Sequence, residues 1–289
     1  MERLPGWLRR HLAAIRAVIV LTLVTGAVYP LAVTGIGQAL FHGDANGSIV
    51  QKDGRDVGSA IVGQNFTAKD GAAVPAYFQS RPSAAGDGYD MQSTAASNLG
   101  PEDVVDVLPN PAGADKAARE GRRSLLTQVC ARSREIGERE GVSGARPYCT
   151  PDGVGAVLKV FPFAGTPTRV VSVNQACPAA PFVAEYRGVK VECGRPGEDY
   201  SAGRTVPVRG EVTGVRVPAD AVTASGSGLD PDISVAYAEL QAPRVARERG
   251  LRPDRVQALI RQNTTGRALG FMGAPAVNVL QLNLALDKE

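Results

Sequence analysis

The chain has 289 residues, a hydrophobic content of 44% and a formal net charge of +3. This near balance of charge, and the lack of a basic stripe with interleaved aromatic residues, argue against a nucleic-acid-binding protein. The hydrophobic content is enough to build a core, and the 33 glycines and 20 prolines indicate many loops and turns.

Residues 17–41 contain no Asp, Glu, Lys or Arg. At about 1.5 Å of rise per residue, a helix of this length spans about 37 Å, which exceeds the roughly 30 Å hydrocarbon core of a bilayer. We therefore predict one transmembrane helix at 17–41. A cleaved signal peptide is the alternative, although such a peptide has a shorter apolar region and a small-residue exit site.

Four arginines precede this helix: Arg3, Arg9, Arg10 and Arg16. The basic residues just after the helix are offset by aspartates, so the positive-inside rule places residues 1–16 in the cytoplasm and the rest of the chain outside. Small residues inside the span, such as Gly26 and Gly35, favour packing against helices of other proteins, and accidental lipid-facing glycines are the alternative.

Two short strands at 48–51 and 57–62 are predicted after the span, joined by Asp53-Gly54, a dipeptide typical of hairpin turns. Residues 63–100 are polar, punctuated by glycine and poor in large apolar side chains, which predicts ordered loop. The Pro-rich residues 101–116 are typical of a linker.

An amphipathic helix is predicted at 124–140, because apolar residues recur there at helical spacing and Gly141 follows. From 145 to 215 the pattern changes to β-branched and aromatic runs bounded by Gly and Pro. These runs predict a small all-β module, with strands at 157–163, 169–173, 182–192 and 206–217.

All four cysteines follow the span: Cys130, Cys149, Cys177 and Cys193. An even number of cysteines in an oxidising outer compartment predicts two disulfides, for which three pairings are possible. Loop length favours Cys130–Cys149 with Cys177–Cys193. A zinc site is the alternative, but the chain has no CxxC pair and no histidine near these cysteines.

The last part of the chain predicts two helices and a strand. Asp232 or Ser234 can cap a helix that runs to Arg249 and ends at Gly250, and Pro253 starts a second helix through Gln262. Residues 277–286 alternate apolar and polar side chains, which predicts a strand with its leucines on one face.

Catalytic motifs are absent from the sequence. The only histidines, His11 and His42, lie before the span and at its exit, so the outer domain has no Ser-His-Asp set and no histidine-based metal site. There is no GxxxxGK[ST] phosphate loop. Close carboxylate pairs such as Asp103 and Asp106 are interpreted as helix caps or solvated faces. We predict no catalytic residues and no metal.

One loop remains as a candidate binding site: Ser225, Gly226, Ser227, Gly228 and Asp230. A glycine-serine loop before a helix can present backbone N–H groups to a phosphate or a carboxylate. The alternative is a tight turn in which glycine supplies positive φ and the Ser and Asp side chains bind backbone groups.

Several stretches together resemble one family, the C subunit of the Kdp-type potassium-transporting ATPase. In chain order they are TGAVYPLAVTGIGQALF at 25–41, NGS at 46–48, GQNF at 63–66, RPS at 81–83, SNLGP at 97–101, VTASGSGLDPDIS at 222–234, PRVA at 243–246 and LGFMGAPAVNVLQLNLAL at 269–286. The chain departs from the family in carrying an extra segment at about 145–215.

The resemblance implies a single-span, non-catalytic accessory subunit of a potassium pump in the cell membrane. Its implied partners are a channel-like potassium-binding subunit, a P-type ATP-hydrolysing subunit and a small hydrophobic subunit. The family is described as supporting assembly and as a catalytic chaperone that raises the affinity of the pump for ATP. Gln241 and Arg244 are our candidates for contacting the channel-like subunit.

The predicted fold class is α+β, with one N-terminal span and an outer mixed domain formed by residues 42–144 and 216–289 around the β module. The residues of the chain themselves indicate no cofactor. The resemblance implies ATP, but the predicted topology places the 225–230 loop outside, away from cytoplasmic ATP. Two other functions stay open: a membrane-anchored extracytoplasmic enzyme, and a ligand-binding or adhesion module built on the cysteine-containing segment.

Overall fold

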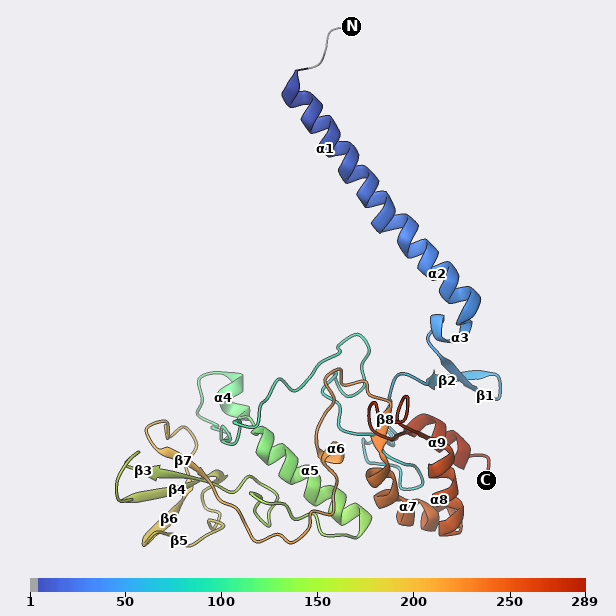
Figure 1. Ribbon diagram of the computed structural model, residues 1–289. Coiled ribbons are helices and arrows are strands. Elements are labelled where there is room, and N and C mark those ends of the chain that lie inside the picture. The colour runs from blue at the N-terminus through green and yellow to red at the C-terminus, as the bar shows by residue number, and fades with distance from the viewer. Residues whose placement is uncertain (1–4) are drawn as a thin grey trace. The chain divides into compact units, whose positions relative to one another are not determined.

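The computed structural model describes residues 5–289 (Figure 1). It combines helices and sheets with one N-terminal apolar helix, as predicted. The chain divides into two compact units, Met1–Ile61 and Val62–Glu289, and each is described by itself. Arg3, one of the arginines behind the topology prediction, lies outside the described residues.

The first unit begins with a continuous apolar helix of 35 residues, Gly6–Leu40, long enough to cross a membrane. It consists of α1 (Gly6–Leu23), a π-helical turn (Val24–Val28) and α2 (Tyr29–Leu40). The π-helical turn ends two residues before Pro30, which has no N–H to donate to the preceding helical turn. The wider turn therefore lets the helix continue through the proline.

A short helix and a hairpin complete this unit. The helix α3 spans His42–Ala45, and β1 (Ile49–Lys52) pairs antiparallel with β2 (Arg55–Ser59). Asp53 and Gly54 connect the strands with φ angles of 52° and 75°, the left-handed values that a two-residue hairpin turn needs. The hairpin predicted from Asp53-Gly54 is confirmed.

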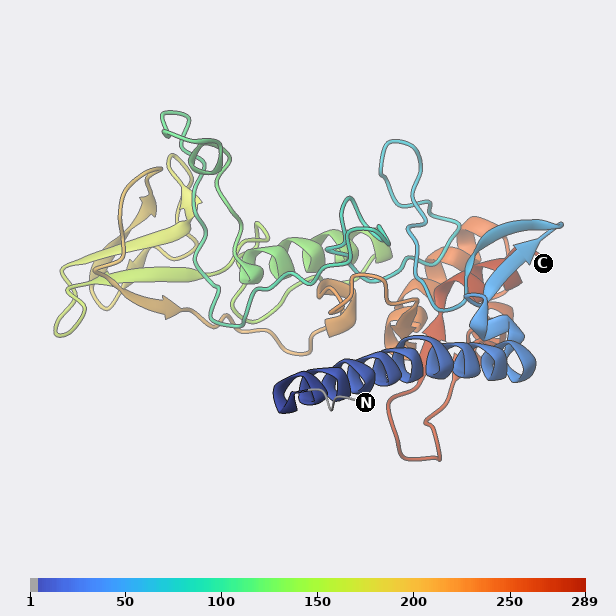
Figure 2. The ribbon, with the colours of Figure 1, turned by 90° about the horizontal axis from the view of Figure 1, so that it is seen from above.

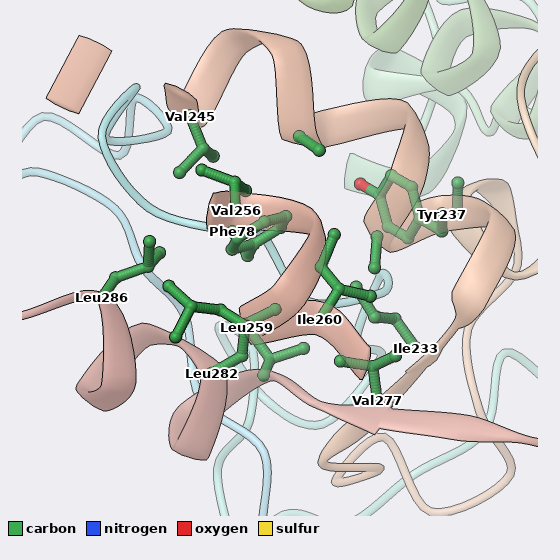
Figure 3. Packing of buried hydrophobic residues seen from close by; sticks show 14 of the residues in the cluster. Phe78, Ile233, Tyr237, Val245, Val256, Leu259, Ile260, Val277, Leu282 and Leu286 are labelled. Atoms are coloured by element: carbon green, nitrogen blue, oxygen red, sulfur yellow. The ribbon is translucent and has the colours of Figure 1, made fainter. Parts of the chain in front are cut away.

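Residues 219–286 of the second unit form a helical core, which consists of three helices, a short helix and a small sheet. Its elements are α6 (Ala219–Val222), β8 (Asp232–Ser234), α7 (Val235–Arg249), α8 (Pro253–Gln262), β9 (Thr264–Thr265), β10 (Ala276–Asn278) and α9 (Val279–Leu286). The strands form an antiparallel sheet in the order β8-β10-β9. Figure 3 shows the apolar side chains of α7, α8 and α9 meeting around Phe78, which comes from a loop.

The helix boundaries at α7 and α8 follow the capping residues. Ser234 accepts a hydrogen bond from the Tyr237 N–H, Gly250 ends α7 in the left-handed region, and Pro253 begins α8. Both helices are confirmed where they were predicted. Residues 277–286, in contrast, were predicted to be a strand, and the prediction was wrong: after three residues of β10 the chain turns into α9.

Helix α9 forms because Asn278 caps it by accepting from the Gln281 N–H, and because leucine has a high helix propensity. Its buried residues include Val279, Leu282 and Leu286, which repeat at helical and not at strand spacing. The alternating leucines of the sequence fit both periods, so the pattern did not discriminate between them.

A second sheet lies between residues 157 and 207. Its strands are β3 (Val157–Phe161), β4 (Arg169–Ala176), β5 (Glu185–Tyr186), β6 (Val189–Gly194) and β7 (Arg204–Pro207). Their order is β5-β6-β4-β3-β7, and only β4 and β6 run parallel. The strand predicted at 206–217 is mostly wrong, because β7 ends at Pro207.

Helix α5 (Leu125–Glu140) joins the sheet to the helical core and confirms the amphipathic helix predicted there (Figure 1). Leu126 packs against the cluster formed by Val157, Val171 and Val173 of the sheet. Ile136, near the other end of α5, belongs to the core around α7. The sheet therefore shares α5 with the rest of the unit and is not a free-standing module.

Residues 101–116, expected to be a linker, are partly packed: Val104 and Val105 contact the apolar cluster of the second sheet, and the stretch leads into α4 (Lys116–Glu120). Asp106 accepts hydrogen bonds from the N–H and hydroxyl of Ser124, and Asp103 accepts from the Leu125 N–H at 2.8 Å. Both carboxylates thus cap the N-terminus of α5, which is one of the two roles predicted for them.

Candidate functional site

The loop at 225–230 is closed by its own side chains. The Ser225 hydroxyl accepts from the Gly228 N–H at 3.0 Å, and the Ser227 hydroxyl accepts from the Leu229 N–H at 3.1 Å. Asp230 Oδ1 accepts from the Asp232 N–H at 3.0 Å. Because these oxygens already bind backbone groups, they shape the turn and do not point into open space as a ligand cradle would.

Gly228 is the one position of this loop where glycine is required. Its φ is +70°, and a Cβ there would lie 2.8 Å from Ala85 Cβ and 2.9 Å from the carbonyl oxygen of Ala95. A Cβ on Gly226 would meet no atom within 4 Å. The loop is therefore pressed at Gly228 against a segment far away in the sequence.

That segment begins with Arg81, Pro82 and Ser83. Arg81 Nη1 lies 2.7 Å from Asp230 Oδ2, and Arg81 Nη2 donates to the Thr223 carbonyl at 3.2 Å. The Ser83 hydroxyl donates to the Gly228 carbonyl at 2.7 Å. The arginine and the serine thus hold opposite sides of the loop.

A third motif, Gly63 to Phe66, meets the same loop. The Gly63 N–H donates to the Leu229 carbonyl at 2.8 Å, and a Cβ on Gly63 would lie 2.5 Å from the Asp230 carbonyl oxygen. Tyr89 packs beside Gly63 and donates from its hydroxyl to the Arg81 carbonyl at 2.8 Å. Burial raises the pKa of Tyr89 to about 12, so this hydroxyl remains a donor at neutral pH.

Gln241 and Arg244, predicted to contact a partner, are buried inside this chain with 0% and 4% of their surface exposed. Arg244 Nε lies 2.9 Å from Glu140 Oε2 of α5, and its Nη1 donates to the carbonyl oxygens of Pro75 and Tyr77. Side chains bound this deeply present no surface to another subunit. Their role is to join α7 to α5 and to the segment 75–79, which contains Phe78.

Three further residues bind or support the segment 75–79 and were not predicted: Asn283, Arg249 and Asp287. The Asn283 side chain accepts from the Phe78 N–H and donates to the Phe78 carbonyl, at 2.9 and 3.0 Å. Arg249 donates to the Ala76 carbonyl at 2.8 Å and pairs with Asp287 at 2.8 Å. A polar residue at a core position of an apolar helix, such as Asn283 between leucines, was the available signal.

A polar hollow of about 290 Å³ lies beside these motifs, lined by side chains that include Ser80, Arg81, Arg132, Glu135 and Arg139. The guanidinium groups are engaged: Arg81 with Asp230, Arg132 with the Val222 carbonyl, and Arg139 with Glu140. This hollow is therefore not an unsatisfied anion site. Among residues 5–289, no group of three or more His, Cys, Asp and Glu side chains could hold a metal.

The cysteines form two disulfides, Cys130–Cys149 and Cys177–Cys193, the pairing favoured by loop length. The first ties α5 to the segment before β3, and the second ties the end of β4 to β6. A larger hollow of about 840 Å³ is lined by Cys130, Cys149, apolar residues such as Phe182, and charged residues such as Arg146 and Glu211.

A family model described as "K+-transporting ATPase, c chain" matches residues 11–114 and 201–288. The chain belongs to this family, KdpC. Three relatives, each named "Potassium-transporting ATPase KdpC subunit", match over nearly their whole length. The relative from Mycobacterium tuberculosis is 36% identical over 280 residues, covering 97% of this chain and 98% of the relative.

The relative from Streptomyces coelicolor is also 36% identical, over 284 residues, covering 96% of this chain and 92% of its own. For the relative from Gemmatimonas aurantiaca the identity is 38% over 268 residues, with 92% and 86% covered. These relatives are named as subunits of a potassium-transporting ATPase, and this chain has one apolar N-terminal helix. Together the two findings indicate a membrane location.

The family model leaves residues 115–200 unmatched, a stretch that starts and ends earlier than the predicted extra segment at 145–215. All four cysteines, helix α5 and strands β3 to β6 lie in it. Because the alignment with the mycobacterial relative spans 97% of this chain, the KdpC family includes members with a counterpart of this segment.

Proposed function

We propose that this chain is the accessory C subunit of an ATP-driven, high-affinity potassium uptake pump. It acts beside a channel-like potassium-binding subunit, a P-type ATP-hydrolysing subunit and a small hydrophobic subunit. The observation that carries the proposal is the family match, which covers both the apolar helix and the helical core with the motif loops.

The N-terminal helix supports a role in assembly. From residue 17 onward it carries no charged side chain, and none of the helix is buried. Gly26 and Gly35 meet no atom within 4 Å at the position of a Cβ. Small residues on a membrane helix allow another helix to approach closely. The helices of the channel-like and small hydrophobic subunits are the partners that this surface would fit.

We also propose that the subunit supports assembly and raises the affinity of the pump for ATP. This effect is exerted through the complex and not by a nucleotide held in the 225–230 loop. The Ser and Asp oxygens of that loop bind its own backbone, and Arg81 already pairs with Asp230. The proposed topology, with the N-terminus in the cytoplasm and both α5 and α7 outside, keeps the loop away from cytoplasmic ATP as well.

Deletion of the gene tests the function. The deletion strain should fail to grow at low external potassium and should grow normally at high potassium, and the intact gene should restore growth. In the wild type, the chain should co-purify with the channel-like and ATP-hydrolysing subunits. Wild-type potassium uptake in the deletion strain would reject the proposal.

Single added cysteines test the topology in intact cells. A Gly6→Cys variant should resist a membrane-impermeant thiol reagent, whereas a Lys288→Cys variant should react. The native cysteines do not interfere, because all four are paired in disulfides. The opposite labelling pattern would reverse the proposed orientation.

A further inference from the structure

The loop between β9 and β10 exposes large apolar side chains. Leu269, Phe271 and Met272 are 83%, 71% and 52% exposed, and they follow one another at the tip of the loop. Figure 2 shows this loop projecting from the elements around it in the second unit. Three neighbouring side chains of this size form an exposed apolar patch, which marks an interaction site more often than a single exposed side chain does.

The backbone of the tip is held in a defined conformation. Ala268 and Met272 exchange two backbone hydrogen bonds of 2.9 Å, and Arg267 Nη1 donates to the Gly273 carbonyl at 3.0 Å. Leu269 takes a φ of 53° and Gly270 a φ of 80°. Since the turn is closed by its own hydrogen bonds, the apolar side chains are presented outward in advance of binding.

The charged residues that flank the tip in the sequence all have one sign. From residue 255 to residue 286 the sequence contains no Asp or Glu, whereas it contains Arg255, Arg261 and Arg267. Arg255 is paired with Glu289, but Arg267 lies directly beside the tip. An apolar tip flanked by arginine is the composition of segments that sit at a membrane interface, where the apolar part enters the acyl region and the cation stays at the headgroups.

We propose that residues 267–273 insert into the lipid surface of the bilayer that the chain itself spans. The chain carries its own anchor, Gly6–Leu40, and only residues 41–61 separate this anchor from the second unit. The short tether keeps the bilayer at high effective concentration around the loop, so a small apolar tip is sufficient for binding. This contact gives the second unit a lipid attachment in addition to the helix.

The test uses the full chain reconstituted alone into phosphatidylethanolamine–phosphatidylglycerol vesicles. Trp7 is the only tryptophan, so the Trp7→Phe variant has no tryptophan fluorescence and serves as the background. In that background, the tryptophan of Phe271→Trp should have its emission maximum at a shorter wavelength than a tryptophan exposed to water. Lipids brominated on their acyl chains should quench this emission. Phe163→Trp is the matched control, since Phe163 is 65% exposed in the loop between β3 and β4, and it should stay unquenched.

Leu269→Trp provides a second reporter at the same tip in case Phe271→Trp does not fold. Emission from both tip variants that is insensitive to brominated lipid would overturn the proposal. If the tip is shielded only when the other pump subunits are present, the loop docks on protein and the proposal fails. A shift that depends on protein concentration but not on bromination would indicate a second copy of the chain and would also reject it.

Discussion

The side chain of Gln241 on α7 pairs with both backbone groups of Gln79, a residue 162 positions earlier in the chain. The Gln79 N–H donates to Gln241 Oε1 at 2.7 Å, and Gln241 Nε2 donates to the Gln79 carbonyl at 3.1 Å. Asn283 on α9 makes the same pair of bonds to Phe78. An amide side chain carries one donor and one acceptor group, so it substitutes for a strand partner and lets an irregular segment enter the core.

Replacing Gln241 should therefore destabilise the second unit. In Gln241→Ala, the N–H and carbonyl of Gln79 lose their partners in a buried site, and we expect the free energy of unfolding to fall by about 2–4 kcal/mol. Urea unfolding of the full chain in detergent, followed by far-ultraviolet circular dichroism, measures this loss. Gln281→Ala on exposed α9 surface is the control and should change little. Equal stability of the two variants would contradict this account.

The sequence did not distinguish this internal role from a docking role. Gln241 and Arg244, on the helix that follows the 225–230 loop, were predicted to contact the channel-like subunit. Both are buried instead, since their partners lie in the segment from Pro75 to Gln79, and a contact over this separation leaves no periodic signal. The turn chemistry of the 225–230 loop was easier to predict, because it depends on residues within three positions of one another.

The fold was predictable where local signals agreed. Helices α5, α7 and α8 combine apolar spacing with a capping serine or an N-terminal proline. For residues 277–286 the alternating leucines fitted a strand, and the capping side chain of Asn278 was the local feature that favoured a helix. The packing of residues 103–106 could not be predicted, because Asp103 and Asp106 contact a helix further along the chain.

Two alanine variants test the close packing of the loop. We expect Gly228→Ala to lower the free energy of unfolding by about 2 kcal/mol, because alanine is unfavourable at positive φ and its Cβ meets Ala85 and Ala95. Gly226→Ala adds the same atom where no neighbour lies within 4 Å, and it should be nearly neutral. Thermal unfolding of both variants provides the comparison, and a neutral Gly228→Ala would be inconsistent with the packing described.

The disulfides should stabilise the chain outside the cytoplasm. Their sequence separations of 19 and 16 residues predict similar effects, so we expect Cys130→Ser with Cys149→Ser, and Cys177→Ser with Cys193→Ser, each to lower stability by about 2–4 kcal/mol. Denatured but unreduced wild-type protein should contain no reactive thiol. Detection of four thiols per chain would show that neither bridge forms.

The N-terminus of α5 should make stability dependent on acid pH. The hydrogen bonds from Arg122 hold the pKa of Asp103 below its usual range, with the Leu125 N–H contributing as well. A carboxyl group with a lowered pKa stabilises the fold above its unfolded pKa of about 3.9, and this contribution is lost as the pH falls through the folded pKa. Arg122→Met should remove part of this stabilisation at neutral pH and approach the wild type in strong acid.

Unfolding midpoints measured across this range compare Arg122→Met with the wild type. Arg216→Met, which removes an exposed arginine elsewhere, is the control and should keep the wild-type dependence on pH. A constant difference between Arg122→Met and the wild type at every pH would mean that Arg122 stabilises the chain without pairing with Asp103.

The last prediction concerns nucleotide binding by the 225–230 loop. The Ser227 hydroxyl accepts from the Leu229 N–H, and the backbone of Ser227 accepts from the Ala95 N–H at 3.2 Å, so the loop is occupied by contacts within the chain. We therefore expect the purified full chain to show no saturable binding of ATP in equilibrium dialysis, and Ser227→Ala to leave that result unchanged. Ser227→Ala should instead lower the unfolding temperature slightly, because one turn hydrogen bond is lost. Saturable ATP binding by the wild type that disappears in Ser227→Ala would show that the loop is a nucleotide site.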